Sequence, residues 1–245
     1  MCKSIILFTC LIMCSSSQLS AEQWKFEVSP YLWAVSQQGQ TGYIDRNGQP
    51  VNVDIDMSFS EIFENLDGAV LVNLQADKGN WNMWIDLVYM KLKYDAKVDN
   101  VSAELTAKQK LLDVVAAYRF ARQGDMHWYS FMGVRFVDVN NQLDVRIVDQ
   151  RLTPNFGDNW VDPLFGLKNK WVINESFYLN SRAELGGFGV GSDLSWALNF
   201  TLNQNLSDNW DLKYSFRYID LDYQDNDFLF DMASSGFGVG VTYQF

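Results

Sequence analysis

The sequence predicts an all-β fold: a transmembrane antiparallel β-barrel of about ten strands, with eight or twelve strands as alternatives. Three observations predict it. Apolar and polar side chains alternate along segments of nine or more residues, short turns alternate with long polar connections, and aromatic residues stand beside the short turns. A soluble β-sandwich alternates in the same way, but its strands are typically about five or six residues long, whereas a tilted membrane strand needs about ten.

The composition narrows the class further. The 245 residues include 15% aromatic and 20% charged residues, and the chain carries a formal net charge of -11. This aromatic content excludes a disordered chain. After the first twenty residues no apolar run approaches the roughly 18 residues of a membrane-spanning helix. The acidic balance argues against a nucleic-acid partner, because phosphate binding needs a basic surface.

The first residues predict a targeting segment. Lys3 precedes an apolar run that ends at Cys14, and a small polar stretch follows up to Ala21. This is the pattern of a secretory signal peptide, so we expect removal of residues 1–21 and a barrel formed by residues 22–245. A lipoprotein with Cys14 as the lipidated residue is the alternative. All 3 cysteines lie in the targeting segment, so we expect no disulfide and no thiolate site in the mature chain.

The rest of the chain alternates with a period of two, which is typical of half-buried strands. From Trp210 to Tyr218 one face carries only leucine and aromatic residues, and the other face carries only polar ones. After a first strand that begins at Trp24, the expected strands cover residues 68–77, 81–93, 104–121, 126–138, 161–173, 176–187, 193–206, 209–221 and 231–245. The total is even, as bacterial barrels require.

The connections predict which end of the barrel is periplasmic. Tight turns are expected at residues 78–80, 122–125, 174–176 and 207–209, and long polar outer loops at 138–160 and 220–230. Aromatic rings favour the membrane interface, so a row of them at one depth forms a girdle. The residues expected in this girdle are Trp81, Phe120, Trp128, Trp171, Phe177 and Trp210.

The first outer connection contains two local signals. Asn47-Gly48 lies between two strand-like stretches and favours a type I′ hairpin turn. Ser58 and Glu61 have the spacing of a helix capping box, and apolar residues at helical spacing follow them. We therefore expect a short helix near residues 58–66, before the returning strand.

The carboxyl-terminal strand carries an apolar face that ends on an aromatic residue. A face of this kind resembles the assembly signal of bacterial outer-membrane barrels, so we expect the barrel-assembly machinery to be a partner. The residues that form the face are Phe237, Val239, Val241, Tyr243 and Phe245.

Four segments carry a wider resemblance. Residues 29–33 (Ser-Pro-Tyr-Leu-Trp), 58–67, 160–167 and 187–189 are similar to a family of small bacterial outer-membrane barrels. This family is grouped with outer-membrane protein A-like barrels and opacity-type surface antigens, and the match covers nearly the whole mature chain. Because its members are mostly uncharacterised, the resemblance implies a fold and an outer-membrane location, and no residue-level chemistry.

Charged side chains alternate with the apolar ones, so we expect them to face the lumen. Thirteen positions follow from parity: Lys25, Glu27, Asp86, Asp113, Arg119, Arg135, Lys168, Lys170, Arg182, Glu184, Asp211, Lys213 and Arg217. Buried charges must be paired or hydrated. The first interpretation is a packed ion-pair network, and the second is a narrow water-filled pore whose basic excess favours anions.

Two arginines of this set are expected to require carboxylates between them to compensate their positive charges. Arg119 and Arg135 lie on strands joined by one tight turn, so their guanidinium groups would repel each other if they lay side by side. We expect Asp113 and Glu184 to be their partners, since one guanidinium fork can hold two carboxylates.

Enzymatic chemistry is not expected. Hydrolases that rely on an imidazole need it near the reacting atoms, and the single histidine, His127, is expected at the periplasmic rim. We expect no cofactor and no metal. The weak candidate for a cation site is the acidic run of Asp220, Asp222, Asp225 and Asp227, whose spacing is not that of an EF-hand loop.

The expected function is therefore a structural or surface-interaction role for an outer-membrane barrel with a charge-filled lumen. The expected partners are outer-membrane lipid and lipopolysaccharide. A narrow, porin-like diffusion channel for small solutes, with anions as the candidate class, is the alternative, and an outer-membrane enzyme is the least favoured one.

Overall fold

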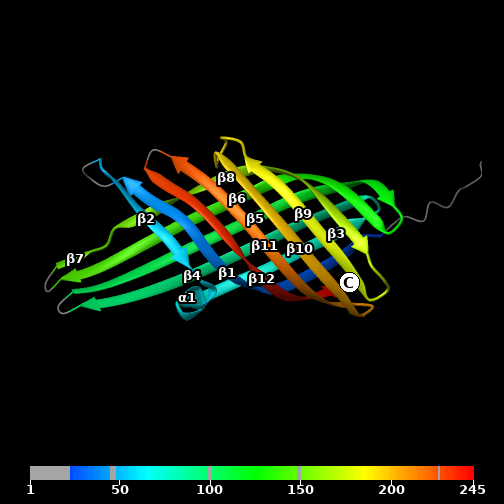
Figure 1. Cartoon of the computed structure of the whole chain (residues 1–245), viewed down its shortest axis with the longest axis horizontal. Coiled ribbons are helices and arrows are strands. Elements are labelled where there is room, and N and C mark those ends of the chain that lie inside the picture. Colours follow the sequence, from blue (N-terminus) through cyan, green and yellow to red (C-terminus); the bar gives the residue numbers. More distant parts are fainter. Residues whose placement is uncertain (1–22, 45–47, 99–100, 148–149, 226) are drawn as a thin grey trace, which may run out of the picture.

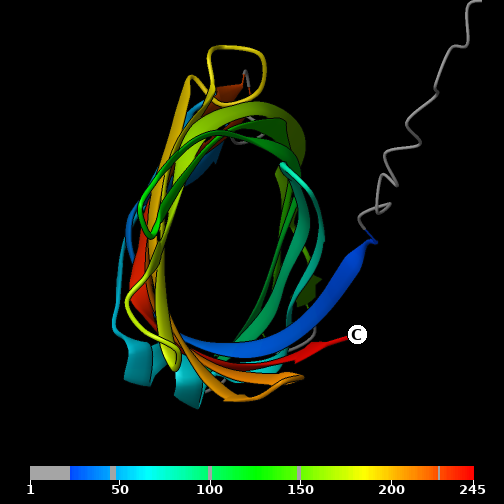
Figure 2. The same cartoon turned by 90° about the vertical axis from the view of Figure 1, so that its right-hand side faces the viewer.

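In the computed structural model of the protein, ten strands close into a ring. The structure describes residues 23–44, 48–98, 101–147, 150–225 and 227–245. The expected signal peptide, residues 1–21, lies outside the described residues. Figure 1 shows the tilted strands from the side, and Figure 2 shows the ring end-on with an elliptical cross-section.

The ring follows the order of the chain, and all its neighbouring strands are antiparallel. Pairing of the last strand with the first closes the ring. Its members are β1 (Lys25–Ile44), β3 (Leu66–Lys78), β4 (Trp81–Val98), β5 (Val101–Gln123), β6 (Met126–Ile147), β8 (Asn155–Val172), β9 (Phe177–Gly187), β10 (Leu194–Ser207), β11 (Trp210–Asp225) and β12 (Phe228–Gln244). Two short strands, β2 (Pro50–Met57) and β7 (Gln150–Leu152), pair with β1 and β6 outside the ring path.

Four short turns lie at one end, here called the periplasmic end. They join β3 to β4, β5 to β6, β8 to β9 and β10 to β11, as the sequence predicted. Gly79 and Gly124 adopt positive φ values of 61° and 58°, which glycine accepts without a Cβ clash. The carboxyl terminus lies at this end too, where the backbone N–H of Phe245 donates to the carbonyl of Phe26 over 3.0 Å.

The opposite, outer end differs from the sequence prediction. Residues 138–160 and 220–230 were expected to be long loops, but most of them belong to strands that continue past the expected boundaries. β5 has 23 residues and β6 has 22, about twice the length needed to cross a bilayer. Polar side chains do not end a strand whose backbone stays paired, and β4, β5 and β6 stay paired in the extension at the left of Figure 1.

The outward face carries a belt of exposed apolar side chains above the periplasmic turns. The girdle residues Trp81, Phe120, Trp128, Trp171 and Trp210 are all exposed, and Phe177 is partly exposed. The apolar face of β12 also points outward, with Phe237 72% and Phe245 67% exposed. Among the residues that the structure describes, no helix has the length and apolar composition needed to cross a membrane.

The interior changes character along the barrel axis. In the periplasmic half the inward side chains are mostly polar or charged, whereas in the outer half they form a buried apolar cluster. Trp160 and Tyr223 stack at 3.9 Å between ring centroids within this cluster. On the outward face of the same outer segment, Asp220 and Asp222 replace the apolar belt. Beyond the belt the barrel therefore resembles a soluble β-structure, with its apolar face inside.

A short helix, α1 (Phe59–Glu64), leads from β2 into β3. Ser58 caps it through the expected capping box, in which the Ser58 backbone N–H donates to the Glu61 carboxylate over 2.8 Å. Hydrogen bonds from the Ser58 hydroxyl and backbone lower the pKa of Glu61. Ile62 is buried in a cluster with Val35 and Leu92, so one side of α1 is anchored to the barrel wall. The turn residue Asn47 lies outside the described residues.

Candidate functional site

Six charged side chains form a layer across the lumen, here called the ion-pair layer. Alternation along five strands brings them to the interior: β4, β5, β6, β9 and β11. Three are acidic and three are basic, so the layer is neutral in sum. Its members are Asp86, Asp113, Arg135, Arg182, Glu184 and Arg217.

Arg135 is the centre of the layer and is fully buried. Its Nε donates to Asp113 Oδ1 over 2.7 Å and its Nη2 donates to Asp113 Oδ2 over 2.8 Å, which is a bidentate pair. The same Nη2 donates to Glu184 Oε1 over 2.5 Å. Charge-assisted bonds of this geometry are the strong ones in proteins. Arg182 pairs with the second oxygen of Glu184 at 3.2 Å.

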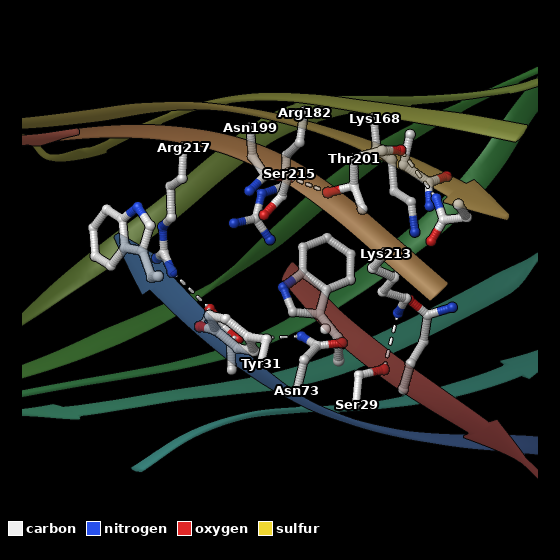
Figure 3. Close-up of a pocket in the computed structure, with 17 residues that line it drawn as sticks. Ser29, Tyr31, Asn73, Lys168, Arg182, Asn199, Thr201, Lys213, Ser215 and Arg217 are labelled. Atoms are coloured by element: carbon white, nitrogen blue, oxygen red, sulfur yellow. Dashed lines mark hydrogen bonds and ion pairs between the residues drawn. The ribbon is translucent and has the colours of Figure 1, made fainter. Parts of the chain in front are cut away.

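Arg217 links β11 to the far wall of the barrel. Its Nη1 donates to Asp86 Oδ2 over 2.9 Å, and its Nη2 lies 3.8 Å from Asp113 Oδ2. Asp86 also accepts a 3.1 Å hydrogen bond from the hydroxyl of Tyr31 on β1. Figure 3 shows Arg217 and Tyr31 extending toward each other from opposite sides. The layer therefore ties together strands that are not neighbours in the ring.

The strand register explains why these charges meet. Asp86 stands opposite Asp113, Asp113 opposite Arg135, and Arg135 opposite Asp162 on successive strands. Two adjacent carboxylates would repel each other, and the arginines placed beside and across from them compensate this. Because unpaired buried charges cost several kcal/mol, the arrangement is favourable only when all partners are present.

A small polar cavity of about 120 Å³ lies beside the ion-pair layer, on its periplasmic side. Four of its lining side chains are basic and one is acidic: Lys168, Arg182, Lys213, Arg217 and Asp86. Lys168 Nζ donates to Asn82 Oδ1 and Lys213 Nζ donates to Ser29 Oγ, at 2.8 and 2.9 Å. The cavity has room for on the order of four water molecules.

The other predicted lumen residues lie nearer the periplasmic end. Glu27 lies 3.9 Å from Lys213, and the Lys170 ammonium lies 4.1 Å from the Tyr178 ring centroid. Asp211 is buried and accepts bonds from the Tyr178 hydroxyl and the Gln244 amide, at 2.9 and 2.8 Å. Lys25 is exposed at the rim.

Arg119 does not occupy the position that the sequence predicted. Arg135 faces Asp113 across the ladder, whereas Arg119 faces Tyr129, so the two arginines are not side by side. The Arg119 guanidinium donates to Asn80 Oδ1 over 2.6 Å, in a periplasmic turn. The expected pairing of Arg119 with Asp113 or Glu184 is therefore wrong. Arg119 lies six residues nearer the turn than Asp113, about 20 Å along an extended strand.

Sequence reasoning missed one further buried carboxylate of the lumen. Asp162 is fully buried and accepts bonds from the backbone N–H and the hydroxyl of Ser192, at 2.6 and 2.8 Å. Trp160 Nε1 donates to the same hydroxyl over 2.9 Å. These bonds hold the β9–β10 hairpin against the inner wall. The alternation of Trp160, Asp162 and Leu164 was the available signal, because it puts Asp162 on the inward face.

In the described residues, the acidic run that was the candidate cation site does not form a metal site. Asp220 and Asp222 point outward from β11, and in the described part of the chain no group of three or more potential ligands could hold a metal ion. His127 lies in the first residues of β6, where its Nδ1 is 3.4 Å from Arg119 Nη1.

Solved structures share this architecture. The chain is similar to the outer membrane protease OmpT from Escherichia coli, with a TM-score of 0.53 and 10% identity over 92% of this chain and 98% of that one. It is also similar to the translocator domain of the autotransporter NalP from Neisseria meningitidis, with a TM-score of 0.42, 10% identity, and 90% and 88% coverage. No family model and no curated protein matches the chain. The closed antiparallel ring and the likeness to OmpT show that the fold is that of bacterial outer-membrane β-barrels.

Proposed function

We propose that the protein is a bacterial outer-membrane barrel with a closed lumen and a structural or surface-interaction role. The ion-pair layer carries this proposal, because Arg135 is fully buried and both Asp113 and Glu184 contact it directly. An open pore would leave such groups hydrated. The buried apolar cluster of the outer half, which includes Trp160 and Tyr223, obstructs the lumen a second time.

The expected partners fit the same proposal. The apolar belt suits contact with membrane lipid, and the outward face beyond it carries Asp222 and Asp231 on neighbouring strands. Acidic groups at that height could bind the cations that accompany lipopolysaccharide. The apolar face that ends at Phe245 suits recognition by the barrel-assembly machinery.

A narrow anion channel is the second candidate. The observation that favours it is the polar cavity, whose lining has four basic side chains against one acidic one. A route through the barrel would require the pairs of Arg135 and Arg217 to separate. Such a route would conduct poorly and would prefer anions.

Conductance of the purified protein in a planar bilayer tests the closed-lumen proposal. We expect no steady single-channel openings at moderate voltage in wild-type protein. Regular openings with anion preference would contradict the closed lumen and favour the channel. The matched variant, Arg135→Met, is measured in the same way. We expect it to show no regular conductance either, because the apolar cluster of the outer half still obstructs the lumen after the central guanidinium is lost.

A further inference from the structure

We propose that the outer half of the barrel binds a single hydrocarbon chain, which enters sideways from the membrane between β1 and β3, beside α1. The site is separate from the ion-pair layer and goes beyond the closed-lumen proposal. Its ligand would be the acyl chain of a fatty acid or of a membrane lipid.

The first observation is an apolar cavity of about 410 Å³. In the part of the chain that the structure describes, no Asp, Glu, Lys or Arg residue lines it. Its inner walls come from aliphatic and aromatic side chains on β4, β5, β6, β11 and β12, including Val88, Leu111, Val137, Ile219 and Phe230. A cavity with such walls favours an apolar ligand over water.

The second observation is that both faces of one strand line this cavity. Trp33 and Val35 point into the barrel from β1, whereas Leu32 and Ala34 point outward, and all four line the cavity. A continuous space can reach both faces of a strand only by passing one of its edges. The cavity therefore connects the inside of the barrel with its outer surface.

The pairing of β1 shows which edge is open. One edge is paired with β12 from Glu27 to Tyr43. The other edge pairs with β3 only from Lys25 to Pro30, and with β2 only from Gln37 to Ile44. Among the described residues, positions 31–36 have no ladder partner on that edge. The opening lies at these six positions, and α1 lies on the outside of the ring there (Figure 2).

The opening faces the apolar belt. Leu32 is 70%, Phe63 64% and Phe237 72% exposed, and all three line the cavity. On the outward face of β12, Ser235, Ala233 and Asp231 follow Phe237 toward the outer end, and the next large apolar residue there is Leu229. The mouth is therefore near the outer margin of the belt, where lipid chains are available.

At its inner end the cavity has polar groups that a polar atom of the bound ligand can contact. Trp33 also lines the polar cavity beneath, and its buried Nε1 has no acceptor among the described residues. A carbonyl or carboxylate oxygen of a ligand could accept that hydrogen. Gln37 Nε2 donates to Gln109 Oε1 over 2.8 Å on the opposite wall, and both glutamines line the cavity.

The size of the cavity agrees with one chain. An apolar cavity of about 150 Å³ takes one benzene ring, so this volume corresponds to on the order of 15 carbon atoms. It also lies in the roughly 300–1,000 Å³ range of small-molecule sites. A single acyl chain fits these limits, whereas a complete two-chain lipid would leave its second chain and headgroup in the membrane.

Native mass spectrometry of the barrel released from nanodiscs tests the proposal. The nanodiscs contain phosphatidylethanolamine and phosphatidylglycerol, with and without added palmitic acid, so the mass of an adduct distinguishes a fatty acid from a phospholipid. The blocking variant is Ala69→Trp, because Ala69 on β3 lines the cavity. The matched control is Val70→Trp, because Val70 is the next residue on the strand and is exposed on the outward face.

We expect one acyl-bearing adduct per barrel in wild type and in Val70→Trp. Occupancy should fall about tenfold or more in Ala69→Trp, because the indole would take the place of several methylene groups. Absence of any adduct in wild type would overturn the proposal, as would full occupancy in folded Ala69→Trp. If Ala69→Trp fails to fold, Ala34→Trp narrows the same mouth from the outward face and carries the same expectations.

Discussion

Arg217 on β11 binds Asp86 on β4 across the lumen, with 2.9 Å between Nη1 and Oδ2, although the two residues are 131 positions apart in the chain. Four steps around the ring separate these strands. The pair therefore acts as a crossbar between opposite walls. Because both side chains are almost fully buried, loss of either partner leaves the other charge buried without its direct ion pair.

A double-mutant cycle should detect this crossbar. Arg217→Met and Asp86→Leu should each destabilise the barrel, and their effects should fall short of additivity by about 0.5–3 kcal/mol. Urea unfolding in lipid vesicles measures the free energies. Additive effects of the two substitutions would show that the pair makes no direct contribution.

Arg135→Ala should lower the free energy of unfolding by about 3–5 kcal/mol. The reason is that Asp113 and Glu184 would both lose their shortest ion pair, and Arg217 at 3.8 Å and Arg182 at 3.2 Å would compensate these buried charges only in part. Arg119→Ala is the matched control, and we expect a change within about 0.5 kcal/mol, since Arg119 binds a periplasmic turn. Equal effects of the two substitutions would contradict the central position of Arg135.

Phe245 should determine the yield of assembled barrel. Deletion of Phe245, or Phe245→Asp, removes the ring that stacks on Phe26 at 5.9 Å where the ends of the barrel join. Heat-modifiable migration on a gel measures the folded fraction in outer-membrane preparations, and we expect a clear decrease. Phe188→Asp, at the exposed tip of the β9–β10 hairpin, should leave the yield unchanged. An unchanged yield without Phe245 would refute its role in assembly.

Gly166 should tolerate no side chain. A Cβ at this position would lie 2.3 Å from both the Ala183 carbonyl oxygen and the edge of the Phe131 ring. Gly166→Ala should therefore cost about 1–3 kcal/mol in urea unfolding. Gly68→Ala is the control, because nothing lies within 4 Å of a Cβ there. A neutral effect of Gly166→Ala would mean that β8 and β9 can move apart locally.

The sequence by itself determined the features that depend on neighbours along the chain. A period of two decides which side chains share a face, so the outward position of Trp210 and Tyr214 and the inward position of Asp211 could be predicted. Turn residues and the Ser58 capping box are local too, and they marked the periplasmic turns and α1. Long outer loops were predicted from polar composition, and this was wrong because backbone pairing continues through polar residues such as Lys110 and Asp138.

Only the tertiary structure decided which groups meet across the barrel. Contacts such as Arg217 with Asp86 depend on strand register and on ring closure, and neither is encoded in any single segment. The separation of Arg119 from Arg135 and the binding of Ser192 by Asp162 depend on register in the same way. The open edge of β1 is also a tertiary property. It exists because β3 and β2 pair with the two ends of β1, and within the described residues positions 31–36 between them have no partner strand on that side.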